Sequence, residues 1–252
     1  MTLPDAVALE RAGMKAWPGI EVSQDGSWVL RAANGYTKRA NSVQPLDPYD
    51  DDDLETRIAQ VRDWYAARGL PPTFRMTPLA SPELSRHLDA AGWTAVERSC
   101  ALGMAMPDVT PDARGECLDP FGDRFLDAQR TMWGYPEIKM QKLIALMRAV
   151  PVPMTGVVLY SDENDAVATS LWAVADGISV TGNVVTDTTA RRRGFASAMM
   201  RTGLAWAKAQ GAATAALNVV ADNAAARRLY AGLGYEWLFD YVYRFPPGEQ
   251  AR

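Results

Sequence analysis

The hydrophobic positions in the second half of the chain predict a sheet flanked by helices. Apolar runs separated by short polar turns indicate an antiparallel meander of three strands. Elsewhere in this half, apolar residues recur every three or four positions, which is the spacing of a helix with one buried face. The expected elements are helices over 125–133 and 138–150, strands over 154–160, 166–174 and 177–185, a helix from Ala196, a strand over 213–219, a helix capped by Asp222 and a strand over 236–245.

The first half shows the same two kinds of pattern. Ser81 followed by Pro82 is a typical helix start, because serine caps a helix and proline is tolerated at its first position. The acidic run ending at Asp53 indicates a second helix start, because carboxylates stabilise the positive end of a helix. The expected elements are a helix over 2–16, strands over 27–31 and 36–43, a helix from Leu54, a strand over 73–76, a helix from Pro82 and a strand over 95–106.

The two halves repeat the same order of elements at a fixed distance along the chain. Gly92-Trp93 and Gly234-Tyr235 each end a helix and precede a long strand, and they are 142 residues apart. The same shift places the helix from Leu54 on the helix from Ala196. An internal repeat indicates two related structural units. The expected division is a diverged first unit over 1–106, a linker over 107–120 and a second unit over 121–252.

A basic stretch, Arg191-Arg192-Arg193-Gly194-Phe195-Ala196, stands where a strand turns into a helix. Such a turn leaves free backbone N–H groups and the positive end of a helix dipole pointing at one place, which favours a phosphate. Gly194 lets the backbone approach an anion without a side chain in the way, and the arginines supply charge for phosphate groups. By itself, the stretch also fits a solvent-exposed basic helix start.

A second motif follows further along the chain. Asp222-Asn223-Ala224-Ala225-Ala226-Arg227-Arg228-Leu229-Tyr230 leads into Leu233-Gly234-Tyr235. Together the two motifs resemble those of the GNAT superfamily of acetyl-CoA-dependent N-acetyltransferases, over roughly residues 120–245. The resemblance implies an α+β fold with a mixed sheet. With the internal repeat, it predicts a tandem GNAT-like fold whose C-terminal copy is intact and whose N-terminal copy is degenerate.

The resemblance also implies roles for individual residues. In the family, the loop that matches Arg191–Ala196 wraps the pyrophosphate of coenzyme A, and the asparagine that matches Asn223 contacts its pantetheine or phosphate arm. The strand end that matches Val184-Val185-Thr186 pairs with the pantetheine arm, and one of its N–H groups polarises the thioester carbonyl. Tyr230 matches the tyrosine that protonates the departing thiolate. Acetyl-CoA is therefore the implied cosubstrate, without a metal.

The implied reaction is attack of a primary amine on the thioester within a ternary complex. A free amine has a pKa near 10, so a base must remove a proton, directly or through water. Many GNAT enzymes place a glutamate on the strand before the loop, but 178–185 contains no carboxylate. Glu137 and Asp187 are candidate bases, and each also fits a surface residue or a turn cap. The missing carboxylate keeps a second hypothesis open, a coenzyme A-binding sensor or interaction protein without turnover.

The first copy lacks the residues that the family uses to bind the cofactor. Shifting Arg191 back by 142 residues reaches Tyr49, so Asp50–Asp53 occupy the place of the phosphate loop. Consecutive carboxylates there repel a pyrophosphate. The equivalents of the family's asparagine and tyrosine are Ser81 and Leu88. We therefore expect the first half to bind no coenzyme A, and to cover the sheet or shape the acceptor cleft instead.

Composition narrows the class of protein further. The net charge of −4 argues against a nucleic-acid binder and mildly favours a cationic amine, small molecule or peptide, as the acceptor. No apolar run approaches the length of a membrane span, and we expect a cytoplasmic monomer or homodimer. Two cysteines and one histidine do not suit a metal cluster, and a lone histidine disfavours a hydrolase triad. A Rossmann-type dinucleotide binder is disfavoured because the loop lacks G-x-G-x-x-G.

Overall fold

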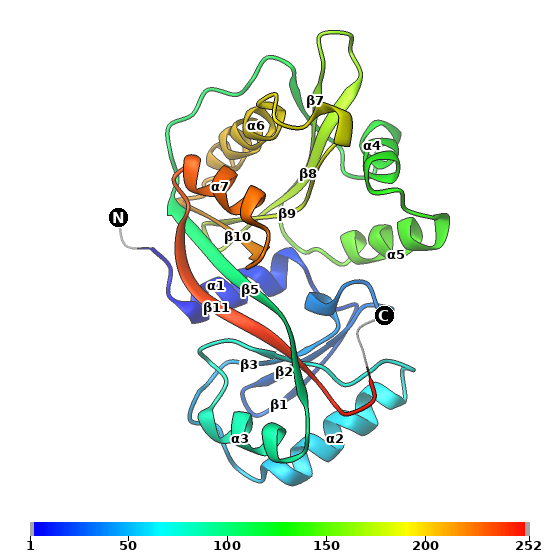
Figure 1. Ribbon diagram of the computed structural model, residues 1–252, viewed down its shortest axis with the longest axis vertical. Coiled ribbons are helices and arrows are strands. Elements are labelled where there is room, and N and C mark those ends of the chain that lie inside the picture. The colour runs from blue at the N-terminus through cyan, green and yellow to red at the C-terminus, as the bar shows by residue number, and fades with distance from the viewer. Residues whose placement is uncertain (1–2, 250–252) are drawn as a thin grey trace.

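Residues 3–249 are described by a computed structural model, and they form helices and strands in mixed order (Figure 1). The α-helices are α1 (Ala6–Ala16), α2 (Leu54–Ala66), α3 (Pro82–Ala90), α4 (Asp123–Trp133), α5 (Glu137–Arg148), α6 (Phe195–Ala209) and α7 (Ala224–Gly232). The strands are β1 (Glu21–Asp25), β2 (Trp28–Ala32), β3 (Val43–Pro45), β4 (Phe74–Met76), β5 (Thr94–Ala105), β6 (Gly115–Leu118), β7 (Met154–Tyr160), β8 (Ala166–Ala175), β9 (Ile178–Thr186), β10 (Thr214–Val220) and β11 (Glu236–Phe245). Two short 3₁₀ helices are η1 (Lys38–Ala40) and η2 (Thr188–Ala190).

The eleven strands of this part of the chain form one sheet, in the order β1-β2-β3-β4-β11-β5-β10-β9-β8-β7-β6. Most neighbours are antiparallel, whereas β3 and β4, and likewise β9 and β10, are parallel. The mixed sheet with flanking helices confirms the predicted α+β class. Between residues 3 and 249, no helix is both long and apolar enough to cross a membrane.

The last strand of each half lies in the sheet of the other half. β5 separates β10 from β11, and β11 in turn separates β5 from β4 (Figure 1). The register between β5 and β11 pairs Glu236 with Gly103 and Phe245 with Thr94, and these two pairs are related by the same 142-residue shift as the repeat. The halves are therefore interlocked through a nearly symmetric pair of long strands.

Helices cover both faces of the sheet in the second half. Trp172 of β8 faces the core beneath α6 and α7. Its neighbours face the opposite side of the sheet, Leu171 toward α4 and α5 and Ala173 toward α1. This alternation follows from the pleat of a strand, which points successive side chains to opposite faces. In the first half, α2 and α3 form a separate core with β2, β3 and β4. The N-terminal helix α1 thus packs on the sheet of the second half.

The predicted strand over 36–43 is wrong. This segment contains η1, and only Val43–Pro45 pairs as a strand. The side chain of Asn41 accounts for the difference, because its Oδ1 accepts hydrogen bonds from the backbone N–H groups of Ala33 and Gly35. Such side-chain bonds offer the backbone an alternative to a β-ladder.

Three smaller features also differ from the prediction. Asp222 does not cap α7; Asn223 does, and its side chain accepts a hydrogen bond from the N–H of Ala226. The segment 107–120, expected as a linker, contains β6, which pairs with β7 at the sheet edge. β1 was not predicted, because its side chains are mostly exposed and lack a clear apolar alternation.

Candidate active site

The centre of the candidate site is a gap between β9 and β10. Their parallel ladder runs from the pair Ile178–Thr214 to the pair Thr181–Leu217 and stops there, although both strands continue. Beyond Thr181 the strands separate, and Val184-Val185-Thr186 lie on the separated end of β9. All three are half-buried. Their backbone groups on the side of β10 are therefore open to an extended ligand.

A β-bulge shapes this end of β9. The ladder with β8 pairs Leu171 with Gly182 but Thr169 with Val185, so β9 holds one residue more than β8 over this interval. Asn183 lies within the extra stretch and adopts a left-handed conformation with φ of 50°. A bulge bends its strand and redirects its side chains. This bulge lies directly after the end of the ladder with β10.

The basic stretch that follows β9 presents backbone N–H groups at the start of α6. Arg192 and Gly194 have positive φ angles of 63° and 83°, and Gly194 occupies the N-cap position. No hydrogen bond within residues 3–249 uses the N–H groups of Arg193, Gly194 or Phe195. A Cβ atom at Gly194 would meet nothing within 4 Å, so the approach to these N–H groups is open.

The arginines of this stretch are exposed, whereas the next two residues anchor it. Phe195 is buried in the core beneath α6 and packs 5.0 Å from the guanidinium of Arg193. Ala196 is half-buried in the first turn of the helix. The structure therefore places the exposed Arg191, Arg192 and Arg193 at the positive end of a 15-residue helix.

The second motif forms the start and the core face of α7. Asn223 caps the helix through its Oδ1 atom, 3.1 Å from the N–H of Ala226, and its Nδ2 has no partner within residues 3–249. Tyr230 is buried, and its ring lies 5.9 Å from that of Tyr235. Burial raises the pKa of Tyr230 to about 12. Its hydroxyl therefore remains protonated at neutral pH and can donate a hydrogen bond.

The two carboxylates considered as bases have other partners. Asp187 accepts hydrogen bonds from the N–H and the hydroxyl of Thr189, at 2.7 and 2.5 Å, and thereby caps η2. The Thr189 hydroxyl and N–H lower the pKa of Asp187, which makes it a weaker base. Glu137 is largely exposed and pairs with Arg130 at 3.2 Å. Among the described residues, no group of three or more His, Cys, Asp or Glu side chains is arranged to hold a metal ion.

A polar cluster beside the bulge was not predicted from the sequence. The Nδ2 atom of Asn183 lies 3.3 Å from the hydroxyl of Tyr36 and 3.5 Å from Oε1 of Gln129. The hydroxyl of Tyr36 also lies 3.4 Å from that of Tyr135, in the loop between α4 and α5. These residues come from both halves and from distant positions, so no local motif marks them.

The family and the relatives that match this chain carry the names of acetyltransferases. The family described as "Probable histone acetyltransferase Rv0428c C-terminal" matches residues 5–244. The uncharacterized N-acetyltransferase YobR of Bacillus subtilis is 26% identical over 254 residues, which cover 96% of this chain and 99% of YobR. The probable histone acetyltransferase Rv0428c of Mycobacterium tuberculosis is 43% identical over 65 residues, which cover 26% of this chain and 20% of that protein.

Solved structures share the fold along nearly the whole chain. A GCN5-related N-acetyltransferase from Kribbella flavida has a TM-score of 0.73 at 23% identity, covering 97% of this chain and 96% of its own. A tandem GNAT protein from the clavulanic acid biosynthesis pathway has a TM-score of 0.65 at 10% identity, covering 99% and 91%. The chain thus belongs to the family of the C-terminal region of the probable histone acetyltransferase Rv0428c, and it is a GNAT acetyltransferase with a tandem fold.

Proposed function

We propose that this acetyltransferase moves an acetyl group from acetyl-CoA to a primary amine, by direct attack in a ternary complex, and that residues 121–252 carry the chemistry. The observation that carries the proposal is the gap between β9 and β10, which opens next to the first turn of α6. An extended pantetheine arm pairs with Val184-Val185-Thr186 much as an added strand pairs with an open sheet edge.

The turn before α6 holds the pyrophosphate in this proposal. The free N–H groups of Arg193, Gly194 and Phe195 and the dipole of α6 favour negative charge at one point. The exposed arginines add charge-assisted hydrogen bonds. Fixing the phosphates there delivers the thioester to one place between the strands, so the translational entropy of the encounter is lost on binding rather than in the reaction.

Tyr230 stabilises the leaving thiolate. Its pKa of about 12 lies above that of a thiol, near 8.5. Complete proton transfer from the phenol to the sulfur is therefore uphill, and a hydrogen bond that strengthens as the C–S bond breaks is the favoured contribution. Asn223 has a free Nδ2 donor at the start of the same helix, which suits the phosphate or pantetheine arm.

The attacking amine must lose a proton without a carboxylate on β9. Asp187 is engaged as a turn cap and Glu137 pairs with Arg130. We place the exit of this proton at water beside the polar cluster of Tyr36, Gln129 and Asn183, on the acceptor side of the gap. Burial raises the pKa of Tyr36, so its hydroxyl acts as a hydrogen-bond relay and not as the base.

A coenzyme A-binding protein without turnover is the alternative, which the missing strand carboxylate permits but the acetyltransferase relatives do not favour. One measurement distinguishes the enzyme from the sensor: the release of free coenzyme A thiol when acetyl-CoA is mixed with each amine of a panel. Thiol release that depends on both acetyl-CoA and an amine supports the enzyme. Tight acetyl-CoA binding without thiol release supports the sensor.

Gly194→Asp tests the phosphate site. The new carboxylate places bulk and negative charge against the phosphates, so calorimetry should show acetyl-CoA affinity reduced by about tenfold or more, roughly 1.4 kcal/mol for each factor of ten. Gly211→Asp is the matched control, because Gly211 also has a positive φ and open surroundings but follows the other end of α6. Unchanged affinity in a folded Gly194→Asp variant would overturn the assignment.

A further inference from the structure

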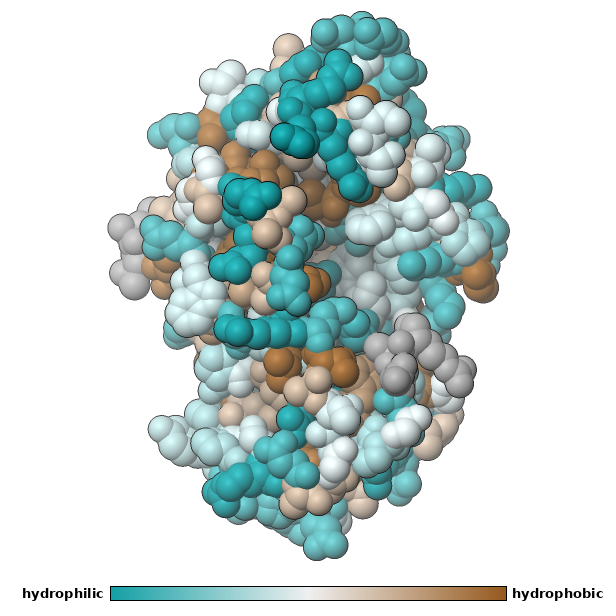
Figure 2. Space-filling model, viewed as in Figure 1, coloured by the Kyte–Doolittle hydropathy of each residue, from teal (hydrophilic) through white to brown (hydrophobic). Residues whose placement is uncertain are grey.

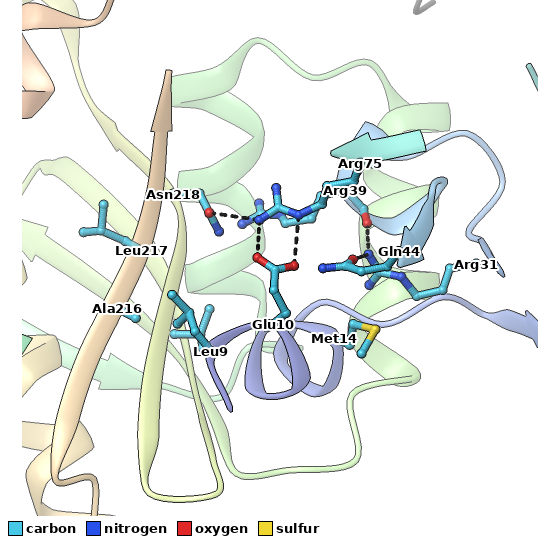
Figure 3. Close-up of a pocket in the computed structure, with 12 residues that line it drawn as sticks. Leu9, Glu10, Met14, Arg31, Arg39, Gln44, Arg75, Ala216, Leu217 and Asn218 are labelled. Atoms are coloured by element: carbon cyan, nitrogen blue, oxygen red, sulfur yellow. Dashed lines mark hydrogen bonds and ion pairs between the residues drawn. The ribbon is translucent and has the colours of Figure 1, made fainter. Parts of the chain in front are cut away.

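A small cavity lies between the two halves, on the sheet face opposite α6 (Figure 3). Glu10 of α1 forms its floor, arginines of the first half form one wall, and β9 and β10 form the other. Asn218 is the first residue of β10 beyond the ladder with β9, so the cavity reaches the point where these strands separate. Its volume of about 20 Å³ suits one compact polar group.

Two arginines of this cavity are buried with part of their donor capacity unused. Nε and Nη2 of Arg75 donate to the carboxylate of Glu10 at 3.1 and 2.7 Å, but Nη1 is enclosed and has no partner within residues 3–249. Arg31 donates to the carbonyl of Trp17 and to the side chain of Gln44, while its Nε is enclosed and, within the same residues, also unpartnered. Enclosed charged donors are costly without an acceptor, so an acceptor is expected there.

A third arginine connects the cavity to the gap between the strands. Arg39 packs its guanidinium 5.1 Å from the ring centre of Trp17. Its Nη2 lies 3.8 Å from the position that a Cβ atom would take at Gly182, the first residue of β9 past the ladder. Among the described residues lining the cavity, the single ion pair joins Glu10 and Arg75. Arg39 is thus a half-buried cation at the mouth of the gap.

The cavity carries excess positive charge. Arg31, Arg39 and Arg75 face one carboxylate, that of Glu10, which leaves two uncompensated charges. Burial and the neighbouring Arg75 lower the pKa of Arg31 to about 10, as expected where like charges are crowded away from water. The guanidinium groups of Arg31 and Arg75 are still charged at neutral pH, because the pKa of Arg31 remains well above 7 and that of Arg75 is raised. A bound anion relieves both the repulsion and the unused donors.

We propose that this cavity binds the carboxylate of the acceptor, so that the preferred acceptor is an amine bearing a carboxylate, such as an amino acid. The inference rests on the proposed function. In the proposed function the thioester arm lies on the side of α6, and the cavity lies on the opposite face of the sheet, next to the end of the ladder between β9 and β10. The net charge of −4 by itself favours a cationic acceptor. The positive charge of the cavity acts on the acceptor more strongly, because salt screens the overall charge of the protein more than it screens buried charges.

The test compares matched acceptors with matched variants. The twenty standard amino acids and their primary amides are offered as two panels with acetyl-CoA, and kcat/KM is measured for each acid and its amide. The wild type should prefer the acids, and Arg39→Gln should reduce the acid-to-amide ratio by about tenfold or more, with partial rescue in Arg39→Lys. Arg62→Gln is the control, because Arg62 also packs over a tryptophan, Trp93 at 5.6 Å, but lies away from the cavity.

A second measurement needs no turnover. In a thermal-shift titration of the wild type saturated with coenzyme A, N-acetyl amino acids should raise the melting temperature further, and the corresponding N-acetyl amides should not. Arg39→Gln should abolish the difference. Equal responses to acids and amides, or a preference that survives Arg39→Gln, overturn the inference. An enzyme that acetylates only amides or lysine-bearing peptides would overturn it and leave the proposed function intact, whereas loss of acetyl-CoA binding would be a failure of the proposed function itself.

Discussion

At the scale of single residues, the environment of Tyr230 sets what its hydroxyl can do. The ring is packed in the core face of α7 against Tyr235. Burial raises the pKa of Tyr230 to about 12, because the phenolate would be poorly solvated there. The residue is therefore a hydrogen-bond donor over the whole physiological pH range, and its contribution to the rate should not titrate near neutral pH.

Tyr230→Phe should lower turnover and leave cofactor binding nearly unchanged. The variant keeps the ring and its packing and removes only the hydroxyl that we propose hydrogen-bonds to the leaving thiolate. Loss of a positioned acid costs about 10²–10⁴ in rate, and we expect the lower end because a thiolate is a tolerable leaving group. The measurement is kcat for the best acceptor beside the acetyl-CoA dissociation constant.

Tyr235→Phe provides the control for that experiment. Its hydroxyl is enclosed and has no hydrogen-bond partner within residues 3–249, so removing it should leave kcat unchanged and the fold as stable or slightly more stable. If Tyr230→Phe also stays within about twofold of the wild type in kcat, Tyr230 is a packing residue and the acid lies elsewhere.

Sequence reasoning located the residues that lie in local motifs and missed those that only the fold assembles. The basic stretch and the helix from Asn223 are contiguous, so spacing alone places them at helix starts. Arg39 and Tyr36 belong to a segment predicted as a strand, and Gln129 lies on a separate helix. Arg39 and Tyr36 meet β9 because the first half folds back onto the second, and Gln129 meets it because α4 packs on β8 and β9. No local pattern encodes either contact.

At the scale of elements, a glycine fixes how α6 sits on the sheet. A Cβ atom at Gly203 would lie 2.0 Å from the ring of Trp172, which is fully buried in β8. Close packing of this helix positions its N-terminus beside the gap between β9 and β10. Glycine is therefore required at position 203 by close packing and not by backbone conformation.

Gly203→Ala should destabilise the fold by about 1–3 kcal/mol, because a rigid ring has no room to move and an overpacked core is strained. Gly232→Ala in α7 is the control: nothing lies within 4 Å of its Cβ position, and alanine should stabilise that helix by about 0.5–1 kcal/mol. Denaturant unfolding measures both. A Gly203→Ala variant as stable as the wild type would show that α6 slides freely on β8.

In the first half, the segment that corresponds to the phosphate loop, Asp50–Asp53, forms hydrogen bonds and an ion pair with other residues of the protein. Asp50 accepts hydrogen bonds from the N–H and hydroxyl of Ser27 and pairs with Arg57 at 2.7 Å. Hydrogen bonds from Arg57 lower the pKa of Asp50 to about 2. In the segment that the 142-residue shift aligns with the phosphate loop, the structure thus has a carboxylate, and its partner Arg57 also pairs with Asp25.

We therefore predict one acetyl-CoA per chain. Calorimetry with excess acetyl-CoA should give a stoichiometry near one, and Gly194→Asp should remove that single site. Asp50→Asn tests the first half directly: it weakens the ion pair with Arg57 and should destabilise the fold without creating a second site. A second molecule bound near Asp50 in either protein would contradict the degeneration of the first copy.

At the scale of the whole molecule, the two halves form one continuous sheet, in which the last strand of each half pairs with strands of the other half. The internal repeat predicted two related units, and the tandem fold confirms it. The exchange of β5 and β11 could not be predicted, because a strand's alternation shows which face is buried but not which strand lies beside it. The buried pair of Arg75 and Glu10 joins β4 to α1 across the same junction.

The exchange leads to a prediction about fragments. Residues 107–252 alone would lack β5, leaving β10 and β11 with open edges in the middle of a sheet. Open edges of this kind promote aggregation. We expect residues 107–252 and 1–106 to be poorly soluble when produced separately, and to form one soluble complex when produced together, with acetyl-CoA affinity within about tenfold of the intact chain.

A nicked protein distinguishes this interlocking from simple dependence on a covalent linker. A protease site inserted between Thr110 and Pro111, both exposed, allows the chain to be cut after it has folded. Because β5 and β11 remain paired along most of their length, the two pieces should stay together on size-exclusion chromatography and separate only when denatured. If residues 107–252 instead form a stable, cooperative unit that binds acetyl-CoA alone, β5 is dispensable, and the first half is an accessory to the catalytic unit rather than part of its sheet.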